Sequence, residues 1–364
     1  MSKPLQVGVI GASAKAGWAR ESHVPAIQKL DGLELGAVVV RTQDEADEAA
    51  RAFGARKGYG DPHALFNDPE IDIVTVAVKV PDHHDLVLGA LKAGKHLYCE
   101  WPLSPTLAQA QELAAAARRA AVKVAIGLQA RASPAVARAR ELIAGGAVGR
   151  VLGGRCYSTS AAWGGVTQPG MVFAEKPEAG VNLVIIQGAH TVDLMISLLG
   201  ELADASALAT RQYSEIAVQG ENRSVPRETL DHILVQGALK TGGTLAAETM
   251  GGRPEGRTPF ELVVMGDEGE LALTGGAPRG FQSGRFSLSL NGEPQEVDEG
   301  ERAGFPDAAL NVAGVYARLR DDVLKDTCTS PDFEHAVRLT KLHEDLLTSS
   351  SDGRRRIADG WPVS

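Results

Sequence analysis

One ten-residue stretch decides the fold, and it reads Gly94, Lys95, His96, Leu97, Tyr98, Cys99, Glu100, Trp101, Pro102, Leu103. A short apolar run ends here in an acidic residue, and a helix-forming segment over residues 106–121 follows. Pro102 has no N–H to donate to a sheet, so the strand ends before it. Ligands of open α/β sheets bind beyond the carboxyl ends of the strands. We therefore expect Glu100 and Trp101 to face a bound cofactor.

The start of the chain shows the same order of strand, turn and helix. Residues 5–10 form an apolar run, and a turn from Gly11 to Gly17 follows it. Glycine lets a backbone approach a pyrophosphate, and the N-terminus of the next helix favours the phosphate charge. Ser13 stands where the usual second glycine would be, and Gly17 falls one residue late. We predict that Gly11, Ser13 and Gly17 contact a dinucleotide.

Further apolar runs over residues 33–40, 71–78 and 122–127 predict parallel strands covered on both faces by helices. Arg41 follows the second strand, where an arginine suits a 2′-phosphate and an acidic residue suits a ribose hydroxyl. Arg41 therefore favours NADP, while the nearby Asp44 and Glu45 keep NAD open. We expect NADP or NAD as the cofactor, with NADP slightly favoured.

The remainder of the chain predicts a second domain of a different kind. Amphipathic or apolar runs predict helices over residues 134–144 and 181–199, with Gln187 and His190 close together on the second. Alternating runs separated by glycine turns predict an antiparallel sheet over residues 151–160, 232–237, 244–250, 260–265, 270–274 and 286–290. Helices over residues 309–324 and 333–349 are expected to close this domain. The expected boundaries are 1–127 and 128–364.

Composition narrows the class of protein. A chain of 364 residues suits two domains, and its net charge of −9 argues against direct nucleic-acid binding. Adjacent helical positions point about 100° apart, so His83 and His84 are not expected to share a metal ion, and we predict no metal site. The chain lacks an apolar run near the roughly 18 residues of a membrane span and a signal-peptide pattern at its start. We expect a cytoplasmic protein.

These residues resemble the family of glucose–fructose oxidoreductase, inositol dehydrogenase and MocA. The matching stretches are Gly11 to Gly17, Pro81-Asp82-His83, Gly94 to Leu103, Gln129 to Pro134 and Gly188 to Asp193. The resemblance implies an α/β Rossmann domain followed by an α+β domain with an open, largely antiparallel sheet. The exposed face of that sheet often forms the oligomer interface, which implies a homodimer or homotetramer. It also implies cofactor contacts from Val80, His83 and Gln129, and a substrate contact from Arg131.

Two positions depart from the family pattern. Trp101 stands where the family usually has the lysine that exchanges a proton with the substrate, and Ile186 stands where it usually has an aspartate. Of the usual set, His190 remains. These features resemble the branch whose best-known member is the fungal repressor of the galactose regulon, which binds NAD(P) without catalysis. The matching stretches of this branch include Gly17-Trp18, His23 to Ile27, and Val225-Pro226 before Asp231-His232, and they add Trp18 to the expected cofactor contacts.

The family usually has the tripeptide Glu-Lys-Pro where this chain has Glu100-Trp101-Pro102. The same tripeptide occurs at Glu175-Lys176-Pro177, outside the strand context of the motif. It precedes the His190 helix, so Lys176 is a candidate to reach the substrate from another direction. We hypothesise an NAD(P)-dependent oxidoreductase of a sugar, polyol or glycoside, with His190 as the acid–base group. Trp101, Arg131, Trp163 and Gln187 are the expected substrate contacts. The alternative is a non-catalytic NAD(P)-binding sensor that acts through a protein partner, and an NAD-dependent glycoside-cleaving enzyme is a minor third reading.

Overall fold

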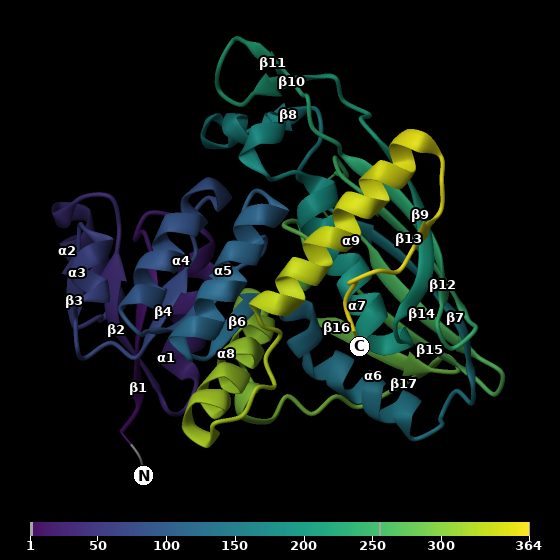
Figure 1. Ribbon diagram of the computed structural model, residues 1–364, viewed down its shortest axis with the longest axis horizontal. Helices are drawn as coiled ribbons and strands as arrows, with labels where there is room; N and C mark the ends of the chain where they lie inside the picture. The colour runs from purple at the N-terminus through teal and green to yellow at the C-terminus, as the bar shows by residue number, and fades with distance from the viewer. Residues whose placement is uncertain (1–2, 255, 364) are drawn as a thin grey trace. The chain divides into compact units, whose positions relative to one another are not determined.

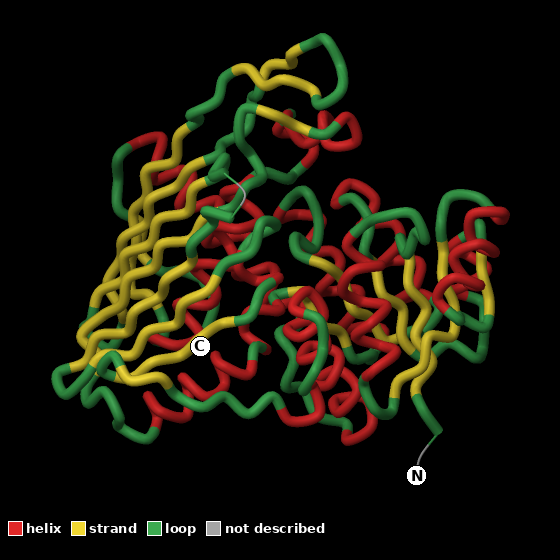
Figure 2. Tube along the Cα trace, turned by 180° about the vertical axis from the view of Figure 1, so that it is seen from behind, coloured by secondary structure: helices red, strands yellow, loops and turns green. Residues whose placement is uncertain are grey.

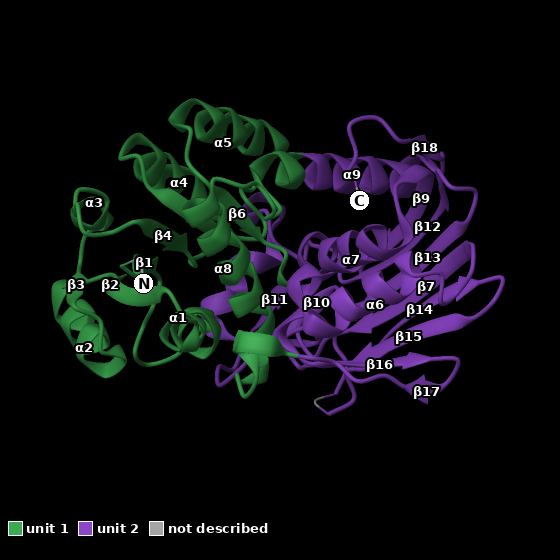
Figure 3. Ribbon diagram, turned by 90° about the horizontal axis from the view of Figure 1, so that it is seen from below, with its two compact units in different colours: residues 1–129, 299–337 green, residues 130–298, 338–364 purple. Residues whose placement is uncertain are grey.

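The computed structural model describes residues 3–254 and 256–363. The chain divides into two compact units (Figure 3). The first unit contains Met1–Gln129 and Glu299–Val337, and the second contains Ala130–Asp298 and Arg338–Ser364. The first cut lies two residues beyond the expected boundary at residue 127. Each unit is described separately below.

The first unit is built on a parallel sheet in the order β3-β2-β1-β4-β5-β6. Its strands are β1 (Leu5–Ile10), β2 (Leu33–Val39), β3 (Lys57–Tyr59), β4 (Ile73–Val76), β5 (His96–Glu100) and β6 (Val124–Gly127). The strand order reverses between β1 and β4. A crevice forms at such a point beyond the carboxyl ends of the strands, and dinucleotides bind there. The expected Rossmann domain is confirmed.

Helices cover both faces of this sheet. They are α1 (Val24–Lys29), α2 (Gln43–Phe53), α3 (Pro62–Phe66), α4 (His83–Lys92), α5 (Leu107–Ala120) and α8 (Asp307–Lys325), with short turns η1 (Ala19–His23), η2 (Val80–Asp82) and η8 (Gly300–Arg302). Figure 3 shows α3, α4 and α5 on one face and α1, α2 and α8 on the other. Because helices cover both faces, the central strands are largely apolar, and β4 is buried at every position.

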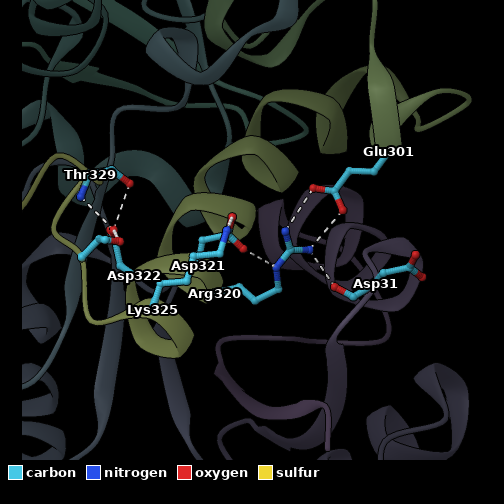
Figure 4. A network of polar contacts seen from close by, with 8 residues as sticks. Asp31, Glu301, Arg320, Asp321, Asp322, Lys325 and Thr329 are labelled. Carbon is cyan, nitrogen blue, oxygen red and sulfur yellow. Dashed lines mark hydrogen bonds and ion pairs between the residues drawn. The ribbon is translucent and has the colours of Figure 1, made fainter. Parts of the chain in front are cut away.

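The sequence analysis placed the helix over residues 309–324 in the second domain, and this placement is wrong. The corresponding helix α8 packs in the first unit. Arg320 donates to the Asp31 carbonyl at 2.7 Å and pairs with Glu301, while Asp322 accepts from Thr329 (Figure 4). Gly32 makes room for this arrangement, since a Cβ there would lie 3.2 Å from Arg320 Cδ. These are long-range contacts that a local pattern does not encode.

The second unit holds a mixed sheet in the order β17-β16-β15-β14-β7-β13-β12-β9-β18. Its strands are β7 (Val151–Thr159), β9 (Leu202–Thr210), β12 (His232–Leu239), β13 (Thr244–Met250), β14 (Phe260–Gly266), β15 (Glu270–Gly275), β16 (Phe286–Leu290), β17 (Glu293–Pro294) and β18 (Arg356–Ile357). Only the β7–β13 pair is parallel among the described strands of this sheet. The expected open, largely antiparallel sheet is confirmed.

Helices of the second unit pack on one face of this sheet (Figures 1 and 2). They are α6 (Pro134–Ala144), η6 (Val184–Gly188) and α7 (Ala189–Leu199); η3 (Gln129–Ala132) and α9 (Phe333–Asp352) cross between the units. Strand β12 shows the consequence, since its buried positions alternate with exposed or half-buried ones. On the opposite face Leu208 and Leu234 lie side by side and are 54% and 41% exposed.

The sequence analysis did not predict β9 or a separate three-stranded sheet. That sheet joins β8 (Val166–Thr167), β10 (Glu215–Val218) and β11 (Ser224–Pro226). The short turns η4 (Pro169–Glu175) and η5 (Pro177–Ala179) come after β8 and before β10 in the chain. Strand β9 is rich in alanine, which gives little contrast between its two faces, so its period-2 pattern is weak. No helix within the described residues is long and apolar enough to cross a membrane.

Candidate functional site

The glycine turn of the first unit has a backbone that only glycine adopts readily. Gly11 has φ of +99°, and a Cβ there would lie 2.3 Å from the Ala77 carbonyl oxygen. Gly17 has φ of +123°, and a Cβ there would meet nothing within 4 Å. The first glycine thus allows two strand ends to approach closely, and the second leaves its backbone open to an approaching group. This arrangement fits a dinucleotide pyrophosphate.

The helix after this turn begins with the π-helical turn η1, which the sequence analysis did not predict. The Val24 N–H bonds to the Ala19 carbonyl five residues back, and α1 begins at Val24 with Pro25 as its second residue. Proline has no N–H, so the regular bonding ladder is interrupted at this junction. Trp18 is half-buried and precedes the π turn, and its carbonyl accepts from Ser22 Oγ at 2.7 Å. π turns occur frequently at functional sites.

A buried polar chain connects the π turn to the carboxyl end of β5. His23 Nε2 lies 2.9 Å from Glu100 Oε1, and His23 Nδ1 lies 2.8 Å from the Tyr316 hydroxyl. The Tyr316 hydroxyl in turn lies 2.7 Å from Thr75 Oγ1. A Cβ at Gly127 would lie 3.0 Å from Glu100 Oε1, so this glycine makes room for the carboxylate. Glu100 is therefore paired with His23 and has room for its carboxylate beside Gly127.

Burial governs the titration of Tyr98 and Tyr316. Burial raises the pKa of Tyr98 well above its usual value, and the Glu100 charge raises it further. Burial likewise raises the pKa of Tyr316. Both phenols therefore stay protonated at neutral pH, and the Tyr316 hydroxyl acts as a hydrogen-bonding group. Their rings lie 4.8 Å apart in an edge-to-face arrangement.

His83, which the sequence analysis expected to contact the cofactor, joins two loops. Its Nδ1 lies 2.9 Å from the Pro102 carbonyl oxygen and its Nε2 lies 3.2 Å from the Val78 carbonyl oxygen. The side chain is completely buried, and this burial lowers its pKa. Both ring nitrogens are thus engaged by backbone, which suits a residue that positions the loops after β4 and β5. The neighbouring Val80 is also buried.

Trp101 and Gln129 lie just beyond the ends of β5 and β6. Trp101 is 6% exposed and its peptide bond to Pro102 is cis. Gln129 is 2% exposed, and its Oε1 has no hydrogen-bond partner among the described residues. A buried amide oxygen without a partner is costly, so such a group favours a site that a ligand completes. The carboxamide N–H of a nicotinamide ring is a hydrogen-bond donor that could pair with Gln129 Oε1.

Arg41 lies two residues beyond β2, in an exposed position. Thr42 follows and caps α2, because its Oγ1 accepts the Glu45 N–H at 3.3 Å. Within the described residues the Arg41 side chain has no hydrogen bond or ion pair. Its guanidinium is therefore available to an anionic group at the end of β2.

The second unit brings Gln187 and His190 together. The expected helix over residues 181–199 is interrupted, since the π turn η6 precedes α7 and contains Gln187. Residues three apart share a helix face, and both side chains are buried, at 2% and 3% exposure. Gln187 Nε2 has no hydrogen-bond partner in the described part of the chain. Thr191 Oγ1 bonds to the Gln187 carbonyl at 2.8 Å, which fixes this segment.

Arg131 is held within the second unit. Its Nε lies 3.5 Å from Asp193 Oδ2, and Arg140 donates to its carbonyl at 3.2 Å. The Arg131 side chain is 11% exposed and that of Asp193 is 2% exposed. The guanidinium expected to bind substrate therefore already neutralises a buried carboxylate. A positioning role fits this geometry better than a direct contact.

The loop before the His190 helix is organised by a residue that the sequence analysis did not single out. Arg227 is 1% exposed, and its guanidinium bonds to Glu175 Oε2 at 2.6 Å, to Asp231 Oδ2 at 3.2 Å and to the Trp163 carbonyl at 2.6 Å. Trp163 itself is half-buried with φ of +65°. Lys176, in contrast, has a side chain 64% exposed.

The structure places the Lys176 side chain on the surface. Its Nζ lies 3.4 Å from Glu228 Oε1 on the surface, while the adjacent Glu175 points into the buried arginine cluster. The local sequence could not distinguish these neighbours, because both precede a proline in an irregular segment. His23 and Arg227 were missed for a related reason. Both lie in or beside the stretches that carry the branch resemblance, but the partners of His23, and Glu175 and Trp163 beside Arg227, are distant in the chain.

The fold and these residues define a protein with an NAD-binding Rossmann domain and a separate α+β domain. A family model described as "Oxidoreductase family, NAD-binding Rossmann fold" matches residues 5–128, and one described as "Gal80p, C-terminal domain" matches residues 134–275. The chain belongs to the family of glucose–fructose oxidoreductase, inositol dehydrogenase and MocA, in the branch with a Gal80-type C-terminal domain.

The chain is similar both to a dehydrogenase and to a regulatory protein. It is 29% identical over 287 residues to the dehydrogenase aclE of Aspergillus oryzae, covering 76% of this chain and 78% of that protein. It is 28% identical over 333 residues to the galactose/lactose metabolism regulatory protein GAL80 of Saccharomyces cerevisiae, covering 83% of this chain and 76% of that protein.

Solved structures agree with the fold. A super-repressor mutant of Gal80p from Saccharomyces cerevisiae superposes with a TM-score of 0.86 at 22% identity, over 97% of this chain and 98% of that one. Levoglucosan dehydrogenase in complex with NADH and L-sorbose gives a TM-score of 0.81 at 19% identity, over 98% and 99%. At these identities the likeness concerns the fold.

Proposed function

We propose that this protein is an NAD(P)-dependent oxidoreductase acting on a sugar, polyol or glycoside. The observation that carries the proposal is the pair of buried polar side chains on η6 and α7, Gln187 and His190. Gln187 Nε2 has no hydrogen-bond partner among the residues that the structure describes. An imidazole accepts and donates protons near neutral pH, and an amide orients a hydroxyl by hydrogen bonding. Sugar dehydrogenases among the relatives support a carbohydrate-like substrate.

The cofactor, when bound, supplies hydride transfer. The glycine turn from Gly11 to Gly17 would hold its pyrophosphate, and Arg41 would hold a 2′-phosphate. Glu100 and Trp101 border the end of β5, where the usual lysine is absent. Tryptophan has no exchangeable acidic proton suited to catalysis, so Trp101 offers an apolar stacking surface and His190 takes the proton.

A purified-protein experiment tests this proposal. Co-purifying nicotinamide is identified, and the absorbance of the reduced cofactor is followed against a panel of sugars, polyols and glycosides. We expect turnover in the wild type and a loss of about 10²–10⁴ in rate in His190→Ala. His232→Ala is a matched control, since His232 pairs with Glu248 on a strand of the sheet.

The second candidate function is a non-catalytic NAD(P)-binding sensor that acts through a protein partner. Trp101 in place of lysine favours this reading, as does the similarity to GAL80 over both units. Tight cofactor binding with no turnover across the panel would support the sensor over the enzyme. In either case we propose that copies of the chain associate through the exposed face of the large sheet.

A further inference from the structure

An ion pair links the glycine turn to the first turn of α2. Lys15 Nζ lies 3.2 Å from Glu45 Oε1, with side chains 67% and 44% exposed. The backbone of Lys15 is held on both sides, because its N–H bonds to Ser13 Oγ at 3.2 Å and its carbonyl accepts from Arg20 at 3.2 Å. The turn therefore directs this lysine toward α2 from a fixed base.

The pair lies where the adenosine end of a dinucleotide is read. In a Rossmann domain the ribose lies near the end of the second strand, and the pyrophosphate lies over the glycine turn. Arg41 belongs to the same short segment as Glu45 and has no side-chain partner among the residues described. A carboxylate suited to a ribose hydroxyl and a guanidinium suited to a phosphate thus stand four residues apart, and Lys15 engages the carboxylate.

We propose that the Lys15–Glu45 pair sets the choice between NADPH and NADH, an inference that rests on the proposed cofactor site. With NADPH, the 2′-phosphate carries about −1.5 to −2 charges and draws Lys15 away from Glu45, so that Lys15 and Arg41 both contact it. With NADH, Glu45 accepts the 2′-hydroxyl and Lys15 stays paired. An exposed ion pair is weak, so exchanging its partner costs little.

If the Lys15–Glu45 pair selects the cofactor, removing the lysine charge and removing the glutamate charge should have opposite effects on NADPH affinity. Lys15→Met removes one phosphate contact and releases Glu45, so the NADPH dissociation constant rises about tenfold while that of NADH stays equal or falls. Glu45→Gln frees Lys15 and removes the repulsive carboxylate, so NADPH binds a few-fold tighter and NADH a few-fold weaker. In the double variant, the gain from Glu45→Gln shrinks because the freed lysine is missing.

The test measures binding, not turnover. Dissociation constants of NADPH and NADH are determined by calorimetry for the full-length wild type, both single variants, the double variant and Arg41→Ala. Lys92→Met is the control, because it removes one positive charge from the exposed end of α4. We expect Lys92→Met to leave the ratio of the NADPH affinity to the NADH affinity within twofold of the wild type. Rising salt should lower this affinity ratio in the wild type, because it screens the phosphate contacts.

Two results would contradict the proposal that the Lys15–Glu45 pair selects the cofactor. If Lys15→Met and Glu45→Gln change the affinities for the two cofactors by equal factors, the pair does not read the 2′ position. If Arg41→Ala alone abolishes discrimination and both other variants match the control, Arg41 reads it without Lys15. Failure of the wild type to bind either cofactor would instead contradict the proposed function, so the two failures are distinguishable.

Discussion

His23 Nε2 lies 2.9 Å from Glu100 Oε1, in a pair whose histidine is completely buried and whose carboxylate is 14% exposed. The histidine ends the π turn that follows the glycine turn, and the glutamate ends β5. The pair therefore couples the segment proposed to hold the phosphates to the segment that carries Trp101. Tyr316 extends the coupling to α8.

Replacing His23 by phenylalanine tests this coupling. The variant removes the His23 partner of the Glu100 carboxylate and leaves the Tyr316 hydroxyl with Thr75 Oγ1 alone, so we expect the free energy of unfolding to fall by about 1–3 kcal/mol. We also expect weaker cofactor binding in the folded fraction. Urea unfolding measures the first effect. Lys240→Met removes one partner of the exposed pair with Glu201 and should change stability by less than about 1 kcal/mol; an equal loss in both variants would contradict the interpretation.

Replacing Arg227 by methionine should destabilise the second unit. The change leaves the buried carboxylates of Glu175 and Asp231 without their shared cation, which we expect to cost about 3–5 kcal/mol in unfolding experiments. Limited proteolysis should then cut the loop around Trp163 faster. Lys176→Met is the neighbouring control, because its pair with Glu228 lies on the surface. A stable Arg227→Met variant with an unchanged cleavage rate would refute the positioning role.

His343 makes stability depend on pH. Burial without a hydrogen-bond partner for either ring nitrogen, among the residues described, lowers its pKa from 6.5 to about 4. The unfolded chain therefore takes up the proton first as the pH falls. The stability contributed by neutral His343 is complete above about pH 7 and is lost progressively between about pH 6.5 and 4, by up to about 3 kcal/mol.

Thermal unfolding of His343→Leu across this pH range checks the prediction. We expect the variant to lose less stability on acidification than the wild type, since leucine does not titrate. His63→Leu, at an exposed position, serves as the control and should retain the wild-type slope. Identical slopes in all three proteins would show that another group is responsible.

Leu234 tests the proposed association through the sheet face. Leu208 and Leu234 are paired across β9 and β12 and expose apolar surface, which marks an interaction site when it is contiguous. We expect Leu234→Glu to shift the protein to a smaller species in analytical ultracentrifugation. Leu324→Glu changes a similarly exposed leucine, 48% exposed, on α8 and should leave the mass unchanged. A wild type that is already monomeric would rule out the association.

Much of the first unit followed from local pattern. Strand β1 has the predicted bounds, and the glycines at positions 11 and 17 adopt the positive φ that the turn requires. Residues near in sequence encode such features, because periodicity and backbone freedom are local properties. The family resemblance also pointed to His190, and the predicted helix placed Gln187 beside it, although the π turn that contains Gln187 was not foreseen. A π turn depends on how a helix packs, and its sequence signal is weak.

The apolar runs, the glycine turn and the family motifs were sufficient to derive the two-domain plan, the parallel sheet and the candidate cofactor segment. Only the tertiary structure showed that α8 packs in the first unit and that Glu175, not Lys176, is buried. Only the tertiary structure showed the pairs of His23 with Glu100 and of Arg227 with Glu175 and Asp231. The physical reason is desolvation. A charge is stable inside a protein only beside a partner, and that partner can come from any part of the folded chain.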